Sequence, residues 1–150
     1  MSRGGFCAIE LRFGTAKINL FSVHLSTYLD ERILACKELN RIIEKIDENE
    51  MIILGGDFNV GVTRLGKGKY TFTEQKEYEE YKVLEKNLIR LPNKEDTWFS
   101  KLGQGCIDTI FYSKSVELIK YENIEANNIS DHNAIYAEFN IWFVQSKVYN

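Results

Sequence analysis

Polar side chains that can bind a cation or transfer a proton occur in four short segments, each close to a stretch of strand-forming residues. These segments are SVHLS, GGDFN, CIDTI and SDHN, and they contribute His24, Asp57 with Asn59, Asp108, and Asp131 with His132. Carboxylates, a carboxamide and imidazoles can together hold a hard divalent cation and orient and deprotonate a water molecule. Each residue alone is also typical of a turn or a structural hydrogen bond, so the pattern must be judged as a set.

Asp57 and Asn59 follow the apolar run MIIL and two glycines. Alternate residues of an extended chain share a face, so both side chains would project together while Phe58 turns into the apolar interior. This arrangement would present two polar groups at the end of a buried strand. The alternative is an ordinary glycine-rich turn after a core strand.

Regular elements must position these residues. Residues 6–13 and 18–25 are rich in strand formers and flank GTAK, which predicts a β-hairpin. Residues 30–50 repeat apolar side chains, Leu34 among them, at helical spacing after two acidic residues, which predicts an amphipathic helix. The helix leads into a predicted strand over residues 51–56.

The segment 61–73 contains three glycines and three basic residues, Arg64, Lys67 and Lys69. This composition predicts an exposed, mobile loop whose basic side chains could contact a polyanionic substrate. Simple solvation of the charges is the alternative.

Three further elements are expected towards the C-terminal end. Residues 74–89 place large apolar side chains on one helical face, which predicts a helix packed on the core. Residues 106–113 and 133–141 have the apolar or alternating pattern of strands. This order of elements predicts an α/β fold with polar residues gathered at strand ends.

Composition limits the class of protein. The 150 residues, 44% of them hydrophobic, suffice for one domain with its own core. No apolar run is long enough to span a membrane and no signal-peptide pattern occurs, so we expect a soluble, cytoplasmic protein. The net charge of −3 neither demands nor excludes a nucleic-acid partner, and the three cysteines, which form no metal-binding spacing, are expected to be buried thiols.

The four motifs, in their order, resemble the C-terminal half of the endonuclease/exonuclease/phosphatase superfamily. The matching segments are His24-Leu25, Gly56-Asp57-Phe58-Asn59, Ile107-Asp108-Thr109-Ile110-Phe111 and Ser130-Asp131-His132, and EDTWF at residues 95–99 also falls at a family position. The resemblance covers nearly the whole chain. It implies an α+β sandwich fold, with a mainly antiparallel sheet flanked by helices, in which residues 1–150 form a single partial domain of the four-layered family fold.

The resemblance also implies a Mg²⁺-dependent phosphodiesterase, with Mn²⁺ as an alternative cofactor and nucleic acid as the leading substrate. Asp57 would orient or deprotonate the attacking water and, with Asp131, belong to the metal site. Asn59 would hold the water or a phosphate oxygen, and His132 would donate a hydrogen bond to the scissile phosphate.

His24 would be a second phosphate contact and a candidate general acid, oriented by Asp108. Both roles follow from the resemblance rather than from spacing. The predicted catalytic set therefore has six members: His24, Asp57, Asn59, Asp108, Asp131 and His132.

The family fold normally begins with another half that supplies the principal Mg²⁺-binding glutamate, in a glutamine-glutamate pair that this sequence lacks. Glu10 lies on a strand that follows this glutamate in the family, so the role is not transferred to it. We therefore expect the sheet to be covered by a separate N-terminal half or by a second copy in a homodimer. The alternative functions are a non-catalytic module that binds phosphate or nucleic acid, and a lipid phosphodiesterase of the sphingomyelinase type.

Overall fold

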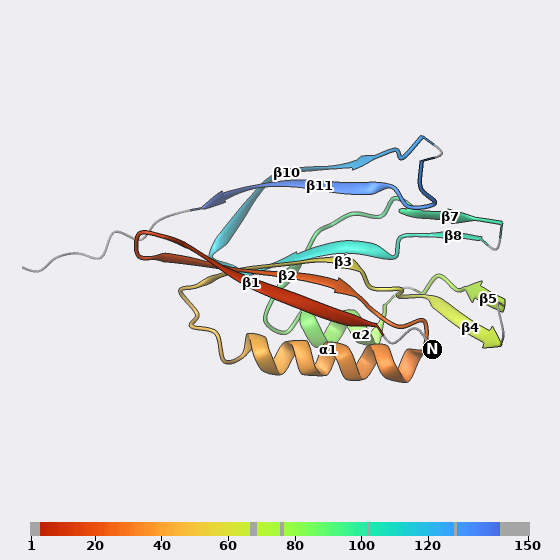
Figure 1. Cartoon of the computed structure of the whole chain (residues 1–150), viewed down its shortest axis with the longest axis horizontal. Helices are drawn as coiled ribbons and strands as arrows, with labels where there is room; N and C mark the ends of the chain where they lie inside the picture. The colour runs from red at the N-terminus through yellow and green to blue at the C-terminus, as the bar shows by residue number, and fades with distance from the viewer. Residues whose placement is uncertain (1–3, 67–68, 76, 102, 128, 142–150) are drawn as a thin grey trace, which may run out of the picture.

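The computed structural model describes residues 4–66, 69–75, 77–101, 103–127 and 129–141 (Figure 1). The helices are α1 (Leu29–Ile43) and α2 (Glu79–Leu84). The strands are β1 (Gly5–Phe13), β2 (Ala16–His24), β3 (Met51–Asp57), β4 (Val62–Gly66), β5 (Lys69–Phe72), β6 (Ile89–Arg90), β7 (Trp98–Ser100), β8 (Gly103–Gly105), β9 (Asp108–Tyr112), β10 (Val116–Ile124) and β11 (Ala134–Ile141).

A five-stranded sheet in the order β1-β2-β3-β9-β6 forms the centre of the fold. Neighbouring strands run antiparallel except for β2 and β3, which are parallel. Parallel neighbours require a crossover connection, and α1 supplies it. The predicted mixed fold with a mainly antiparallel sheet flanked by helices is therefore confirmed.

The sheet separates two apolar clusters. On one face α1 and α2 pack against residues such as Phe21, Leu54 and Phe58 to form the larger core. On the other face β10 and β11 form a separate two-stranded sheet (Figure 1), whose Val116 belongs to the second cluster together with Ile18, Met51 and Tyr112. The molecule thus has three layers: the two helices, the central sheet and the two-stranded outer sheet.

Helix α1 is shorter than the sequence predicts, because it ends at Ile43 and not near residue 50. The following residues form turns, one of which is closed by Asp47, whose carboxylate accepts hydrogen bonds from Asn49. Leu34, predicted to join the apolar face, is 64% exposed, and this part of the prediction is wrong.

Most of the described residues of the segment 61–73, predicted to be a loop, form the antiparallel strand pair β4–β5, in which Arg64 pairs directly with Tyr70. Among the described residues of the range 74–89, only α2 forms the predicted helix, and Leu88 reaches the core from the turn beyond it. The sequence pattern gave no indication of β6, β7, β8 or β10.

A buried arginine ties the β4–β5 strand pair to the helices. Arg32 of α1 is 2% exposed, and its Nε lies 2.9 Å from Oε1 of Glu80 in α2. Its Nη1 donates a hydrogen bond of 2.7 Å to the carbonyl of Val62 at the start of β4. These contacts satisfy both buried charges and fix where β4 leaves the core.

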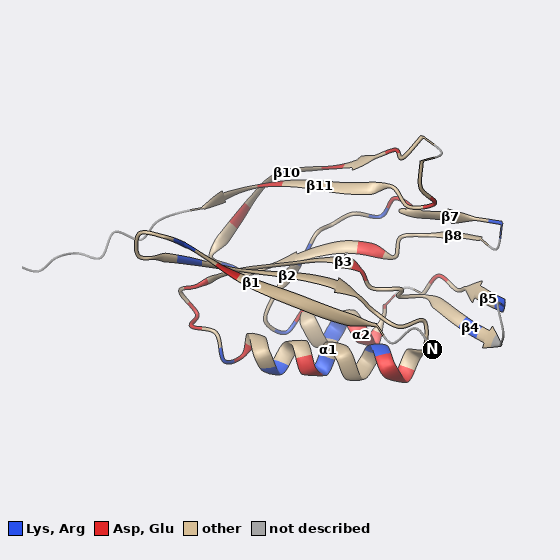
Figure 2. Ribbon diagram, viewed as in Figure 1, with Lys and Arg blue, Asp and Glu red and all other residues tan. Residues whose placement is uncertain are grey.

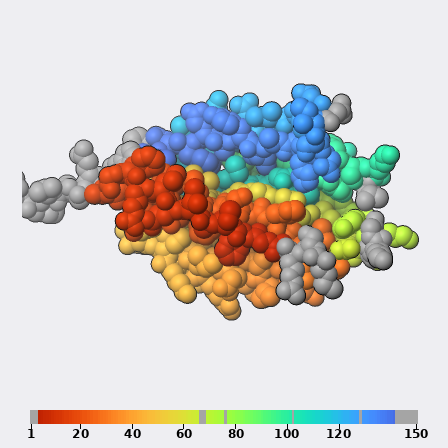
Figure 3. All heavy atoms as spheres, viewed as in Figure 1, coloured from red at the N-terminus to blue at the C-terminus, as the bar shows by residue number. Residues whose placement is uncertain are grey.

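Strand β1 forms one edge of the sheet and is exposed along its whole length (Figure 3). Every second residue of β1 lies on the same face of the strand. On one face these residues are Cys7, Ile9, Leu11 and Phe13, which we call the β1 stripe. Cys36 is buried and Cys106 half-buried, but Cys7 is exposed, so the expectation of three buried thiols is wrong for Cys7. No helix in the described part of the chain is long and apolar enough to cross a membrane.

Candidate active site

Three polar residues lie in one row across the ends of three neighbouring strands. In the sheet register His24 of β2 pairs with Asp57 of β3, and Asp57 pairs with Asp108 of β9. Paired residues share a face, so the row brings together two carboxylates and an imidazole from distant sequence positions (Figure 2 shows acidic residues on both β3 and β9). Nε2 of His24 lies 3.5 Å from Oδ2 of Asp57, although the His24 side chain is 71% exposed.

The row depends on close contact between β2 and β3 at Gly56. This residue has φ of 140°, and a Cβ atom there would lie 2.1 Å from the carbonyl oxygen of Val23. Only glycine fits such a conformation and such an approach of two backbones. The second glycine of the GGDFN motif therefore sets the position of Asp57.

Asn59 reaches the site by a turn and not by strand alternation. β3 ends at Asp57, and Asn59 has φ of 51°, in the left-handed region that asparagine tolerates. Its backbone N–H donates to Oδ1 of Asp57, and its side-chain amide donates to Oδ2 of Asp57 and to the carbonyl of Leu25. These bonds engage the amide nitrogen, so the amide oxygen is the atom that can meet a cation or a water. Phe58 is fully buried, as predicted.

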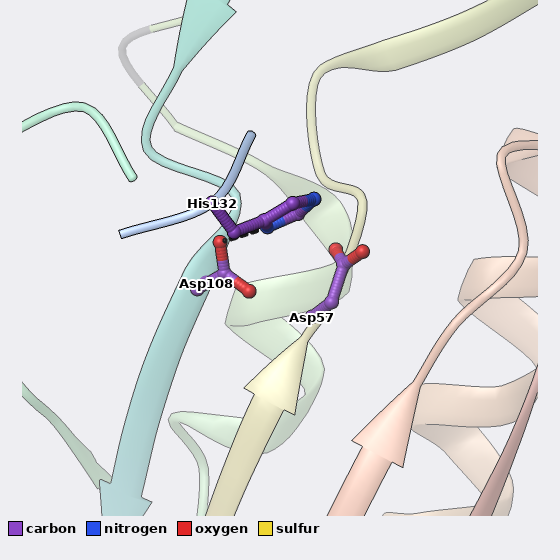
Figure 4. A group of neighbouring side chains, drawn as sticks. All are labelled: Asp57, Asp108 and His132. Atoms are coloured by element: carbon purple, nitrogen blue, oxygen red, sulfur yellow. Dashed lines mark hydrogen bonds and ion pairs between the residues drawn. The ribbon is translucent and has the colours of Figure 1, made fainter. Parts of the chain in front are cut away.

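Asp108 orients His132 and not His24. Its Oδ2 lies 2.9 Å from Nδ1 of His132, and this contact is drawn as a dashed line in Figure 4. The carboxylate therefore accepts the Nδ1–H and directs the ring so that Nε2 is available to a ligand. The expectation that Asp108 orients His24 is wrong, because His24 contacts Asp57 instead.

A buried threonine, Thr97, connects the strand and the segment that carry this pair. Its hydroxyl oxygen accepts hydrogen bonds from the backbone N–H groups of Ile107 and Asp108, at 3.1 and 3.0 Å. Its carbonyl accepts the N–H of Asn133, next to His132. Thr97 thus holds both members of the pair in register, a role that the EDTWF motif could have suggested.

The surroundings of Asp57 and His132 raise the pKa of both side chains. Burial, and next the charge of Asp108, raise the pKa of Asp57 from 3.8 to about 6. Burial alone would lower the pKa of His132, but the hydrogen bond and the charge of Asp108 outweigh it and raise that pKa above 6.5. Asp57 is therefore a proton acceptor near neutral pH, and His132 is a readily protonated donor.

Asp57, Asp108 and His132 place one potential ligand atom each within 4.8 Å of one another. These side chains converge from the end of β3, the start of β9 and the segment before β11 (Figure 4). Asp131 is outside this trio among the described residues, yet it lines the same pocket of about 380 Å³ as Asp57, Asn59 and both histidines. The pocket therefore collects the predicted catalytic residues, with Asp108 below His132.

Sequence comparison assigns the chain to a family. A sequence model of the Endonuclease-reverse transcriptase family (Exo_endo_phos_2) matches residues 18–136, which include all the predicted catalytic residues. The chain belongs to the endonuclease/exonuclease/phosphatase superfamily. A search of curated proteins gives no significant match.

Solved structures of this superfamily share the fold at low sequence identity. TDP2 of D. rerio, in complex with a single-strand DNA product, is 19% identical with a TM-score of 0.67, over 91% of this chain and 62% of that structure. The endonuclease domain of TRAS1, a telomere-specific non-LTR retrotransposon, is 19% identical with a TM-score of 0.64, over 93% and 64%. The mannosyl-6-phosphatase Bt3783 of Bacteroides thetaiotaomicron is 19% identical with a TM-score of 0.61, over 85% and 53%. The chain thus spans little more than half to two thirds of the length of these superfamily members.

The three basic residues that were predicted to contact the substrate differ in their position relative to the pocket. Arg64 lines the pocket together with His24 and Asp57. Lys69 is exposed on β5 and is not one of the lining residues, and Lys67 lies outside the described residues. Sequence reasoning missed two aromatic residues that also line the pocket, Tyr70 and Trp98.

Proposed function

We propose that the chain carries the catalytic residues of a phosphodiesterase that depends on a divalent cation and hydrolyses nucleic acid. The observation that carries the proposal is the convergence of Asp57, with its raised pKa, on the Asp108–His132 pair, whose histidine lines the same pocket as Asp57. Hydrolysis of a phosphodiester requires a base that deprotonates the attacking water and a donor that stabilises the phosphate oxygens. Asp57 would be this base and His132 this donor. Membership of the superfamily supports the same reaction class.

The donor set fits a hard divalent cation. Asp57, Asp131 and the amide oxygen of Asn59 would hold Mg²⁺ or Mn²⁺, because both ions prefer carboxylate and carbonyl oxygen. When bound, such a cation neutralises charge on the phosphate oxygens. Nδ1 of His132 is engaged with Asp108, which leaves the imidazole for the substrate.

The side chains divide the proton transfers between them. Asp57 takes a proton from the water whose oxygen attacks phosphorus, and the bond from phosphorus to the leaving oxygen breaks. Protonated His132 donates its Nε2–H to a non-bridging oxygen as negative charge develops there, while Asp108 stabilises the imidazolium. His24, exposed at the edge of the pocket, supplies the proton to the leaving oxygen.

Nucleic acid is the proposed substrate class for two reasons. Arg64 adds a guanidinium to the pocket, and guanidinium groups bind phosphate through paired N–H donors. TDP2 of D. rerio was solved with a single-strand DNA product, and the TRAS1 domain is an endonuclease.

The test is hydrolysis of bis(p-nitrophenyl) phosphate, single-stranded DNA, nicked duplex DNA and RNA, with Mg²⁺ or Mn²⁺ and with EDTA. We expect cation-dependent hydrolysis that Asp57→Ala abolishes and that Glu38→Gln, on the exposed surface of α1, leaves intact. Equal rates for wild type and Asp57→Ala would overturn the proposal. A folded protein that binds DNA without hydrolysing it would instead indicate a binding module.

We further propose that the chain is a partial domain whose β1 stripe is covered by polypeptide equivalent to the remainder of the superfamily fold. The exposed apolar residues of β1 and the partial coverage of the solved relatives support this view. The cover would also bring any additional cation ligand. Supplying the missing half in trans should raise the rate of hydrolysis, and an unchanged rate despite complex formation would argue against this role.

A further inference from the structure

A second cavity, of about 290 Å³, is lined by residues of β5, α2, β6 and β9 and of neighbouring segments. None of the described residues that line it also lines the catalytic pocket. Its walls include Phe72, Tyr78, Tyr81, Arg90, Cys106 and Thr109. We call it the Tyr81 cavity.

The hydroxyl group of Tyr81 has no partner in the fold. The residue is 4% exposed, and its hydroxyl oxygen is buried without a hydrogen bond to any described residue. The ring is held in place, because the ring centres of Phe58, Tyr78 and Phe111 lie 5.9, 5.7 and 5.6 Å from its own. The guanidinium carbon of Arg90 lies 4.4 Å from the same ring centre. The hydroxyl is therefore fixed in a position where the protein leaves it unsatisfied.

This hydroxyl lies near the part of the cavity wall that Cys106 forms. Burial raises the pKa of Tyr81 well above 10, and Cys106 is the neighbouring residue that adds most to this rise. The hydroxyl thus stays protonated and remains a hydrogen-bond donor. Thr109, 3% exposed, brings a second hydroxyl to the same cavity. Because a buried polar group without a partner is costly, an acceptor atom that enters the cavity and meets Tyr81 is stabilised there.

The aromatic residues of the wall favour a flat occupant. Phe72 and Tyr78 line the cavity together with Tyr81. The Phe72 ring lies so close to Gly105 that a Cβ atom at this glycine would come within 2.3 Å of it, so this ring is also held in place. Rings that are fixed in this way bind another ring by offset or edge contacts.

The charged residues of the wall favour an occupant without net charge. Nε of Arg90 lies 3.0 Å from Oε1 of Glu85, and Oε2 of Glu77 lies 2.6 Å from Nζ of Lys82. The other charged lining residues are Glu74, Lys94 and Asp96. A wall with charges of both signs, two of them already paired, attracts neither an anion nor a cation strongly.

We propose that the Tyr81 cavity binds a small, neutral, planar molecule with a hydroxyl or carbonyl oxygen that accepts the O–H of Tyr81. Phe72 and Tyr78 would contact the flat body of this molecule. Cys106 would lie beside the oxygen that Tyr81 binds. The inference goes beyond the proposed function, because it concerns a site that the proposed reaction does not use.

The test is a titration of the isotope-labelled chain, followed by the NMR signals of the backbone amides of Cys106 and Thr109. Phenol supplies a hydroxyl and benzamide a carbonyl oxygen. Toluene is a flat molecule of similar size without either group, and benzoate is the anionic counterpart of benzamide. We expect saturable shifts of both amide signals with phenol and with benzamide at millimolar concentration, and weaker binding of benzoate.

Tyr81→Phe removes the donor and keeps the ring. It should weaken the binding of phenol and of benzamide by about tenfold, the worth of one hydrogen bond, and leave that of toluene unchanged. Its unfolding midpoint in urea should match that of wild type, because the hydroxyl makes no bond within the described protein. Tyr112→Phe, which removes a hydroxyl from the second apolar cluster, is the matched control and should leave every affinity unchanged. Cys106→Leu adds volume to the cavity wall and should weaken the binding of all these probes.

Amide signals of Cys106 and Thr109 that do not move with phenol or benzamide, or that move without saturation, would overturn the inference and leave the cavity to water. Equal weakening of phenol and toluene in Tyr81→Phe would also overturn it, because the hydroxyl would then not select the ligand. Benzoate bound more tightly than benzamide would reject a neutral ligand. None of these measurements involves hydrolysis, so the inference stands or falls separately from the proposed function.

Discussion

The carboxylate of Asp108 lies 2.9 Å from Nδ1 of His132, and this contact joins the end of the central sheet to the segment before β11. Asp108→Asn removes the negative charge that raises the pKa of His132, so that pKa should fall. NMR titration of the two histidine Cε1–H signals, assigned with His24→Gln, measures the change directly. Hydrolysis should fall by about 10²-fold. An unchanged His132 titration in Asp108→Asn would contradict the assigned orientation.

Ionisation of the Asp57 carboxylate should lower the free energy of unfolding as the pH rises above the acidic range. Its pKa is raised to about 6, so between about pH 4 and 6 the native state holds a proton that the unfolded chain has released. Stability therefore falls as pH rises through this window, by up to about 3 kcal/mol, since one pKa unit is about 1.4 kcal/mol. Asp57→Asn should unfold at higher urea concentration than wild type at pH 8 in EDTA, and the gain should vanish near pH 4. A gain that is the same at both pH values would contradict the assigned pKa.

Two adjacent glycines should respond differently to alanine. Gly56→Ala places a methyl group against the backbone of Val23 at a φ that alanine rarely adopts, and should cost at least about 2 kcal/mol. Gly55→Ala is the matched control: its nearest contact, at 3.3 Å, is the side chain of Ile110, which can move, so the cost should stay within about 1 kcal/mol. Urea unfolding compares the two, and equal losses would argue against the close approach of β2 and β3.

Thr97 should be a positioning residue for the Asp108–His132 pair. Thr97→Val leaves the buried N–H of Ile107 and that of Asp108 without their acceptor, and should lower the free energy of unfolding by about 2 kcal/mol. The His132 titration should shift in this variant, which a purely structural loss elsewhere would not produce. Thr97→Ser keeps the hydroxyl and should restore the wild-type titration. Failure of serine to restore it would refute the role of the hydroxyl.

The β1 stripe should bind hydrophobic probes. In the chain by itself, Ile9→Lys with Phe13→Lys should reduce the fluorescence of a bound hydrophobic dye, because both side chains are more than half exposed. The double variant should retain its unfolding midpoint, since neither residue lies in the core. Leu34→Lys, at an exposed leucine on α1, is the matched control and should leave dye binding unchanged. Loss of folding in the double variant would show that the stripe is already covered.

The sequence predicted that polar motif residues such as His24, Asp57 and Asp108 gather at strand ends, but the row that they form depends on the strand order, which the sequence did not predict. It paired Asp108 with His24, whereas in the structure Asp108 contacts His132 and His24 contacts Asp57. That choice depends on the path of the segment before β11, which is set by backbone bonds to Thr97 and by the bridge to Trp98.

The β4–β5 strand pair was missed because its glycines and lysines are typical of an exposed loop. Local composition does not reveal the cross-strand pair of Arg64 and Tyr70, nor the buried ion pair of Arg32 and Glu80 that anchors these strands. Tyr70 and Trp98 line the pocket from β5 and β7, so no single stretch of sequence could indicate that they meet there.

Cys7, within the β1 stripe, makes the wild-type chain suited to site-selective chemical labelling. Burial raises the pKa of Cys36 to about 12 and that of Cys106 to about 11, so both stay protonated thiols while Cys7 is exposed. A maleimide fluorophore or nitroxide should therefore attach to β1 without any engineered cysteine. Its spectrum would report directly on whatever partner docks against that edge of the sheet.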